Sequence, residues 1–345
     1  MAGASAPAPP ADVLPVSPPR EGTSAWPLLD RLWYRLCWAA GIGLCLIASA
    51  VVIYMLVKGI GYLKLSLFVT SPAPSQIQTQ SGGFLDPIIG TLIVTTIGTL
   101  LAAPIGIGVS VWLSEYAHPS WLARTIESGL EMLAGVPSIV LALFGLLIFS
   151  QGFLSFLSQG TAHGALGESF LAAGAVMSGL AVPLVVGSTR EGFDQLPSRL
   201  REASLALGKT RSTTARHVLL PANKPAIASG VVLGMGRIIG DTAIITVLLG
   251  GTLKNEPVGG VPILGTLRGT GSTLTSYVFN NSPAGEGNAH EKAYAAAFVL
   301  LLVVLALNAT VTHLTNRGRP DSERGSMLKL LRFSWPGWRS TRWTR

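Results

Sequence analysis

The sequence predicts an all-α, polytopic membrane protein with about six transmembrane helices. Three observations support this fold class. Only 12% of the 345 residues are charged, the mean hydropathy is +0.50, and long apolar stretches recur along the chain. Because soluble globular domains carry about 25% charged residues, much of the surface of this chain must face lipid rather than water.

Six stretches can cross the membrane, because a transmembrane helix needs about 20 mainly apolar residues to span roughly 30 Å of hydrocarbon. The predicted spans are residues 36–57, 88–113, 132–150, 169–189, 226–250 and 293–316. The first, second, fourth and sixth contain no Asp, Glu, Lys or Arg. The fifth contains Arg237 and Asp241, the two charged residues that we expect at membrane depth.

The basic residues between the spans predict the orientation. Of the 25 Lys and Arg residues, 19 lie on the side of the N-terminus and five on the other side, and Arg237 lies inside a span. Short loops rich in Lys and Arg stay in the cytoplasm, so we expect both termini there. The predicted organisation is a disordered Ala- and Pro-rich tail over 1–30, a first helix and outer loop over 31–80, a membrane core over 81–316 with a cytoplasmic loop over 190–224, and a basic tail over 317–345.

The composition also excludes several classes of function. Cys37 and Cys45 lie eight residues apart in one apolar run, which offers neither a disulfide framework nor a metal site; we expect no metal, no cofactor and no catalytic residues. Basic residues are spread over short segments, so nucleic acid is not an expected partner. The sequence has no His-Glu-x-x-His motif of a membrane enzyme and no inverted repeat or acidic relay of a self-contained secondary transporter or channel.

The loop between the fourth and fifth predicted spans is amphipathic. Leu200, Ala203 and Leu207 alternate with charged residues, and a second apolar group follows at 218–220. Gly208 separates the two groups, which predicts a helix, a break and a second helical piece. Such a surface helix is typical of a segment that fills a groove on another protein.

This loop resembles the signature of a known family. The matching positions are Glu202, Ala203, Ser204, Gly208, Val218, Leu220 and Pro221. They are similar to Glu-Ala-Ala, three residues, Gly, nine residues, Ile-x-Leu-Pro in the membrane subunits of binding-protein-dependent ABC importers, with mild departures at Ser204 and Val218. The resemblance implies a MetI-like type I permease fold. It also implies that the loop docks on a cytoplasmic ATPase through Glu202, Ala203, Gly208, Leu220 and Pro221.

Other stretches resemble the phosphate branch of this family, namely 105–108, 113–117, 133–140 and 237–242. The sequence of residues 135–138 is more similar to the A-type (PstA-like) permease than to the C-type. The resemblance implies a non-enzymatic chain of the bacterial inner membrane. The implied partners are membrane lipid, a second permease (PstC-like), a dimer of a cytoplasmic ATP-binding subunit (PstB-like) and an extracytoplasmic phosphate-binding protein (PstS-like). An ABC importer for sulfate, molybdate or an organic solute stays open as an alternative.

Arg237 and Asp241 are the main predicted substrate-pathway residues. A cation at the bilayer centre costs at least ~2.5–3.5 kcal/mol, so Arg237 should face the helix bundle. Asp241 lies four residues later, on the same face of the predicted helix, and is able to pair with it. The guanidinium fork suits phosphate geometry, which favours a pathway role; a structural ion pair is the alternative. The resemblance leads us to expect Glu where this chain has Asp241.

Weaker pathway candidates are Thr242, in the same motif, and Ser138. Ser138 lies with Gly135 and Pro137 in a stretch that can leave backbone N–H donors for an anion at membrane depth; a simple helix kink is the alternative. Thr91, Thr95 and Thr99 recur every four residues and form one hydroxyl stripe. We expect such a stripe to serve close packing of helices.

Overall fold

The computed structural model describes residues 27–72, 82–117, 120–151, 154, 167–250, 255, 262–282 and 290–316. The described residues form helices and no β-strand, which confirms the all-α fold class. The predicted tail over 317–345 lies outside these ranges, and so does nearly all of the tail predicted over 1–30. The first helix begins at Leu28, inside that predicted N-terminal tail.

Four predicted spans are continuous helices. They are α1 (Leu28–Gly59), α2 (Leu85–Glu115), α5 (Phe170–Asp194) and α13 (His290–Asn316). Each is long and apolar enough to cross a membrane, which confirms the first, second, fourth and sixth predicted spans. The described residues divide into two units at Tyr54, so most of α1 belongs to the first unit and the residues from Met55 onward belong to the second. Two short 3-10 helices, η2 (Ile60–Tyr62) and η3 (Leu65–Phe68), follow α1.

The third predicted span, over 132–150, is not one continuous helix, because this region belongs to two helices. α3 (Trp121–Gly135) and α4 (Ser138–Ser150) meet at an angle of 105°. The cause is Pro137, which disfavours helical backbone at the residue before it; Val136 is extended, with φ −69° and ψ 131°. Residues 132–135 therefore end the amphipathic helix α3, and α4 begins a new direction.

The fifth predicted span, over 226–250, is also broken. α9 (Lys224–Gly240) ends before Asp241, whose backbone is extended with φ −84° and ψ 118°, and α10 (Ala243–Leu249) begins two residues later. A second bend of 72° separates α9 from the helical piece before it. Counting each bent pair as one span gives up to six spans, as the sequence predicted.

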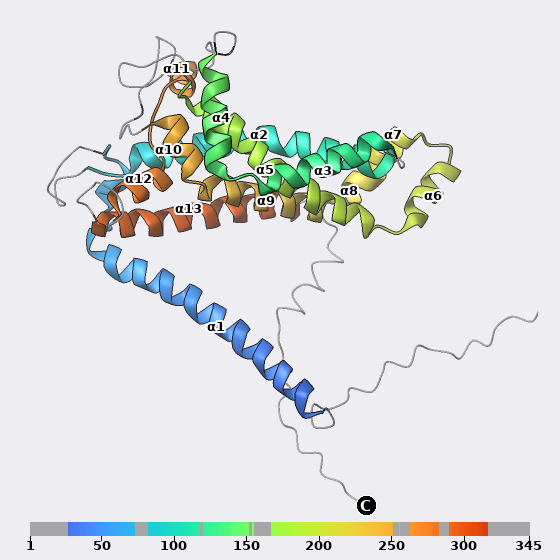
Figure 1. The fold of residues 1–345 in the computed structure, drawn as a ribbon, viewed down its shortest axis with the longest axis horizontal. Helices are drawn as coiled ribbons and strands as arrows, with labels where there is room; N and C mark the ends of the chain where they lie inside the picture. Colours follow the sequence, from blue (N-terminus) through green and yellow to red (C-terminus); the bar gives the residue numbers. More distant parts are fainter. Residues whose placement is uncertain are drawn as a thin grey trace, which may run out of the picture. The chain divides into compact units, whose positions relative to one another are not determined.

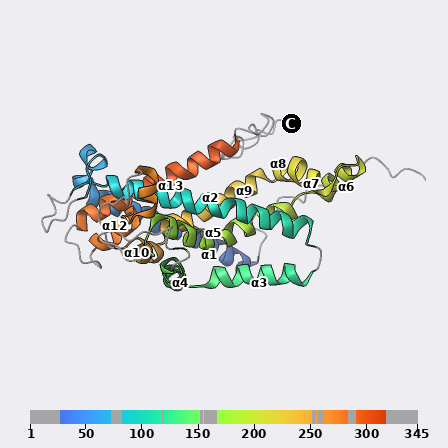
Figure 2. The ribbon, with the colours of Figure 1, turned by 90° about the horizontal axis from the view of Figure 1, so that it is seen from above.

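The second unit is built around α2, α5 and α9, which pack against one another (Figure 2). Small residues bring these helices close together. A Cβ atom added to Gly98 of α2 would lie 2.9 Å from Ile238 of α9, and one added to Gly174 of α5 would lie 2.5 Å from Ile97 of α2. Gly174 leaves no room for a larger residue because the added atom would also lie 2.8 Å from Cβ of Ile97, whereas at Gly98 the end of the Ile238 side chain would have to shift. Small residues at helix contacts are common in membrane bundles.

The two ends of this unit carry different elements (Figure 1). One end holds α6 (Ser198–Ala206), α7 (Arg211–Thr214), the π-helix η5 (Ala215–Leu219) and α8 (Leu220–Ala222). The opposite end holds α11 (Pro262–Arg268) and α12 (Leu274–Asn281). There α12 packs against α13 and α2, so α2 reaches from one end of the unit to the other.

Candidate functional site

The segment between α5 and α9, residues 195–223, has the predicted arrangement of helix, break and helix, and we call it the α6–α8 segment. Gly208 ends α6 in the left-handed region, with φ +74°. Its N–H donates to Leu205 O at 2.9 Å, and Lys209 N–H donates to Ser204 O at 3.2 Å. This hydrogen-bond pattern is a Schellman motif.

Gly208 is required for its backbone conformation rather than for close approach. A Cβ atom added at this position would meet nothing within 4 Å. Non-glycine residues seldom adopt positive φ, so the penalty for replacing Gly208 comes from the backbone alone.

The two faces of α6 have different surroundings. Arg201 and Ser204 lie three residues apart on the face toward the protein, where Ser204 is buried and Arg201 is partly buried. Glu202 and Ala203, the signature residues between them, are exposed. Leu207, just after α6, is 79% exposed. The outward face of α6 therefore exposes both apolar and acidic side chains.

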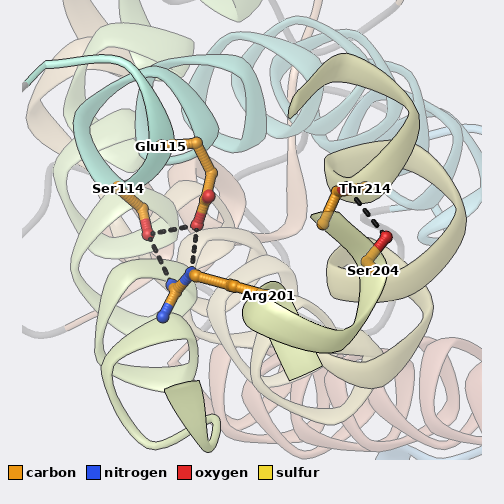
Figure 3. Close-up of polar contacts among 5 residues, drawn as sticks. All are labelled: Ser114, Glu115, Arg201, Ser204 and Thr214. Carbon is orange, nitrogen blue, oxygen red and sulfur yellow. Dashed lines mark hydrogen bonds and ion pairs between the residues drawn. The ribbon is translucent and has the colours of Figure 1, made fainter. Parts of the chain in front are cut away.

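Arg201 joins α6 to the end of α2 (Figure 3). Its Nε donates to Glu115 Oε1 at 2.8 Å, and its Nη2 donates to Ser114 Oγ at 3.3 Å. The side chains of Arg201 and Glu115 are 29% and 10% exposed. This ion pair joins residues 86 positions apart, and we did not predict it from the sequence.

A second contact closes the α6–α8 segment on itself. The hydroxyls of Ser204 and Thr214 lie 2.9 Å apart, both side chains are buried, and they connect α6 to α7 across the Gly208 turn (Figure 3). The family signature has Ala where this chain has Ser204. The departure that we regarded as mild therefore supplies a hydrogen bond that alanine cannot make.

Asn223 attaches the other end of the segment to α5. It lies at the bend between α8 and α9, is buried, and donates from Nδ2 to Thr189 O at 2.8 Å. Ser188 Oγ donates to Ala226 O nearby, at 2.9 Å. We did not predict Asn223 from the sequence, although prolines two residues before it and two residues after it, Pro221 and Pro225, indicate a helix break. Of the predicted docking residues at this end, Leu220 is partly buried and Pro221 is exposed.

The pathway candidates Arg237 and Asp241 lie at the break between α9 and α10. Arg237 Nη2 is 3.9 Å from Asp241 Oδ2, and the side chains are 48% and 4% exposed. Asp241 Oδ1 accepts a hydrogen bond of 3.0 Å from Ile244 N–H, which caps the start of α10. Asp241 therefore follows α9 rather than lying on one helical face with Arg237. Thr242 is partly exposed beside it.

The other candidates lie on different elements. Ser138 is the first residue of α4, which packs against α10 and α5. On α2, Thr91 and Thr95 are buried and donate to carbonyl oxygens of their own helix, those of Pro87 and Thr91. Thr91 Oγ1 also accepts from the first N–H of α12, that of Leu274, at 2.9 Å. This contact supports the prediction that the stripe serves packing.

Nothing in the described part of the chain brings together three or more His, Cys, Asp or Glu residues as a metal site would. The arrangement presents a partly exposed arginine, Arg237, before the break between α9 and α10, and exposed apolar and acidic side chains on α6 at one end of the unit.

Comparison with protein families matches residues 102–319 to the binding-protein-dependent transport system inner membrane component. A probable ABC transporter permease of Bacillus subtilis (strain 168), YqgH, is 33% identical over 235 residues, 65% of this chain and 73% of that protein. The phosphate transport system permease protein PstC of Xylella fastidiosa (strain 9a5c) is 28% identical over 239 residues, 65% of this chain and 71% of the relative. PstC 2 of Mycobacterium tuberculosis (strain H37Rv) is 30% identical over 237 residues, 64% of this chain and 73% of the relative.

These phosphate-transport relatives are named PstC, the C-type permease. The sequence of residues 135–138, in contrast, resembles the A type. Among solved structures, a bacterial alginate ABC transporter matches with a TM-score of 0.57 and 16% identity, over 84% of this chain and 95% of that one; this likeness concerns the fold. The family match covers more than half of the 345 residues. The chain therefore belongs to the binding-protein-dependent transport system inner membrane components, and it is a membrane-spanning permease of an ABC importer.

Proposed function

We propose that this chain is the C-type permease subunit of a bacterial phosphate importer. With an A-type permease it forms the path for inorganic phosphate across the inner membrane. ATP is hydrolysed on a separate cytoplasmic dimer, and an extracytoplasmic binding protein delivers the anion. The observation that carries the choice of cargo is the match to relatives named for phosphate transport, over about two thirds of this chain.

The exposed face of α6 is the docking surface for the ATPase in this proposal. It presents Glu202, Ala203 and Leu207 outward, and the Schellman turn at Gly208 fixes the direction in which the chain leaves α6. The α6–α8 segment then lies in the cytoplasm with both termini. The excess of Lys and Arg on the same side supports this orientation.

Arg237 is the anion-contacting residue of the pathway. Its side chain is half exposed, and its ion-pair partner among the described residues, Asp241, is 3.9 Å away and 4% exposed. Because Asp241 is also engaged by the N–H of Ile244, it leaves most of the guanidinium fork available. A phosphate oxygen pair fits that fork with two parallel hydrogen bonds.

Purification of the tagged chain in mild detergent tests the composition of the complex. We expect an ATP-binding subunit and a second permease to co-elute, both identified by mass spectrometry. Ala203→Asp puts a second acid beside Glu202 on the exposed face of α6, and it should remove the ATPase while the second permease still co-elutes. Retention of the ATPase by Ala203→Asp would contradict docking through this face, and a wild-type chain that elutes without an ATPase would contradict the proposal as a whole.

A further inference from the structure

The ion pair between Arg201 and Glu115 links two helices firmly, and we call this contact of Arg201 with Glu115 and Ser114 the α6–α2 joint. It connects the docking helix α6 to the last residue of α2, a helix that reaches the opposite end of the unit. The guanidinium contacts two groups at once, Glu115 Oε1 at 2.8 Å and Ser114 Oγ at 3.3 Å. Two contacts from one planar group fix direction as well as distance, so α6 cannot rotate on α2 without breaking one of them.

Glu115 needs a cation at this position. As the last residue of α2, it places a negative charge at the negative end of the helix dipole, which is unfavourable. Its side chain is only 10% exposed, so water screens the charge weakly. Arg201 compensates for both effects, and the contact is consequently stronger than an exposed surface pair.

Among the described residues, the side-chain hydrogen bonds and the ion pair that join α6 to a long helix are those of Arg201. The hydrogen bond between the side chains of Ser204 and Thr214 stays within the α6–α8 segment. Asn223 joins α8, not α6, to α5. A movement of α6 therefore reaches α5 through the chain itself, but it reaches α2 through Arg201.

We propose that Arg201 is a positioning residue that transmits the movement of the ATPase-docked α6 to α2. This inference rests on the proposed docking of α6. From Glu115 to Thr91, the residue of α2 that binds the N–H of Leu274 in α12, is a rise of about 36 Å at ~1.5 Å per residue. A displacement at the α6 end of α2 is thus delivered to the end that carries α12.

The chain offers a matched control in the ion pair between Arg190 of α5 and Glu127 of α3, with an Nη1 to Oε1 distance of 2.6 Å. It joins the same two residue types across two helices, but its side chains are 41% and 33% exposed. It touches neither α6 nor α2. Arg190→Gln therefore removes an arginine of the same chemistry without touching the proposed joint.

The test uses the complete importer, with both permeases, the ATPase and the binding protein, reconstituted in liposomes. The readout is phosphate imported per ATP hydrolysed, beside ATPase co-elution. In Arg201→Gln we expect this ratio to fall at least about fivefold, the lower range of coupling between sites, with co-elution unchanged. Arg190→Gln should stay within about twofold of wild type. The double variant Arg201→Glu with Glu115→Arg should recover most of the ratio lost in either single change.

Three results would contradict the proposed role of Arg201. They are a wild-type ratio in Arg201→Gln, an equal fall of the ratio in Arg190→Gln, and a loss of ATPase co-elution in Arg201→Gln. If Arg201→Gln does not accumulate, Arg201→Lys replaces it, because lysine keeps the charge without the guanidinium fork. The ratio of phosphate to ATP in Arg201→Lys should lie between those of wild type and Glu115→Gln. A wild-type ratio in both Arg201→Lys and Glu115→Gln would contradict the proposed role of Arg201. The proposed function is tested separately by the wild-type complex. If that complex imports another oxyanion, the phosphate proposal fails while the ratio for that anion still decides the role of Arg201.

Discussion

Asp241 uses its two carboxylate oxygens for different contacts. Oδ1 accepts from Ile244 N–H and caps α10, whereas Oδ2 faces Arg237 at 3.9 Å. Asp241→Asn keeps an oxygen for the cap and removes the charge, while Asp241→Ala removes both. We expect Asp241→Ala to lower stability by about 1 kcal/mol, the usual value of a helix cap, and Asp241→Asn to stay close to wild type. Thermal unfolding in detergent measures this, and equal losses in the two variants would show that the cap contributes little.

Gly208 gives a second prediction at the residue scale. With φ +74° and open space around an added Cβ, the cost of a substitution depends on how well the new residue tolerates positive φ. Asparagine occurs there several times more often than other residues, and β-branched residues almost never do. Gly208→Asn should therefore retain most uptake and ATPase co-elution, and Gly208→Val should lose both while still inserting in the membrane. If the two variants behave alike, the Schellman turn is not what the docking requires.

At the scale of elements, α2 and α12 are joined by a hydrogen bond that the hydroxyl stripe supplies. Thr91 accepts from Leu274 N–H, but Thr95 bonds only within α2 among the described contacts. Thr91→Val leaves a buried N–H without a partner, which costs about 1–3 kcal/mol, and Thr95→Val should cost less than ~1 kcal/mol. Both residues are 3% exposed, so the pair is well matched. Unfolding of the two purified variants should differ in this order, and the reverse order would contradict the role of Thr91.

The helices that sequence reasoning predicted well are those whose apolar residues run without interruption. The third and fifth predicted spans are interrupted for local reasons, since Pro137 bends the chain between α3 and α4 and Asp241 follows the end of α9. Both signals are present in the sequence, but a continuous apolar window conceals them. Contacts such as Arg201 with Glu115 were beyond reach, because no local pattern indicates which of several charges 86 residues away will be adjacent.

At the scale of the whole molecule, the orientation predicts which loops are accessible from outside the cell. A cysteine introduced in place of Gly285, which lies outside the described residues, should react with an impermeant thiol reagent added to intact cells. A cysteine in place of Ser212, exposed on α7, should react only after the membrane is opened. We expect this pattern because 19 basic residues lie on one side and five on the other, and the side rich in Lys and Arg stays in the cytoplasm. The opposite labelling pattern would reverse the topology and remove the docking surface from the cytoplasm.

Uptake of labelled phosphate by the reconstituted complex tests the central claim most directly. With binding protein and ATP supplied on their proper sides, we expect ATP-dependent accumulation of phosphate that excess sulfate or molybdate does not inhibit. Arg237→Gln, reconstituted in equal amount, should lose most of this accumulation because a neutral amide lacks both the charge and the fork of arginine. Accumulation of sulfate or molybdate in place of phosphate would contradict the proposed cargo, and wild-type phosphate uptake by Arg237→Gln would contradict the role of Arg237 in the pathway.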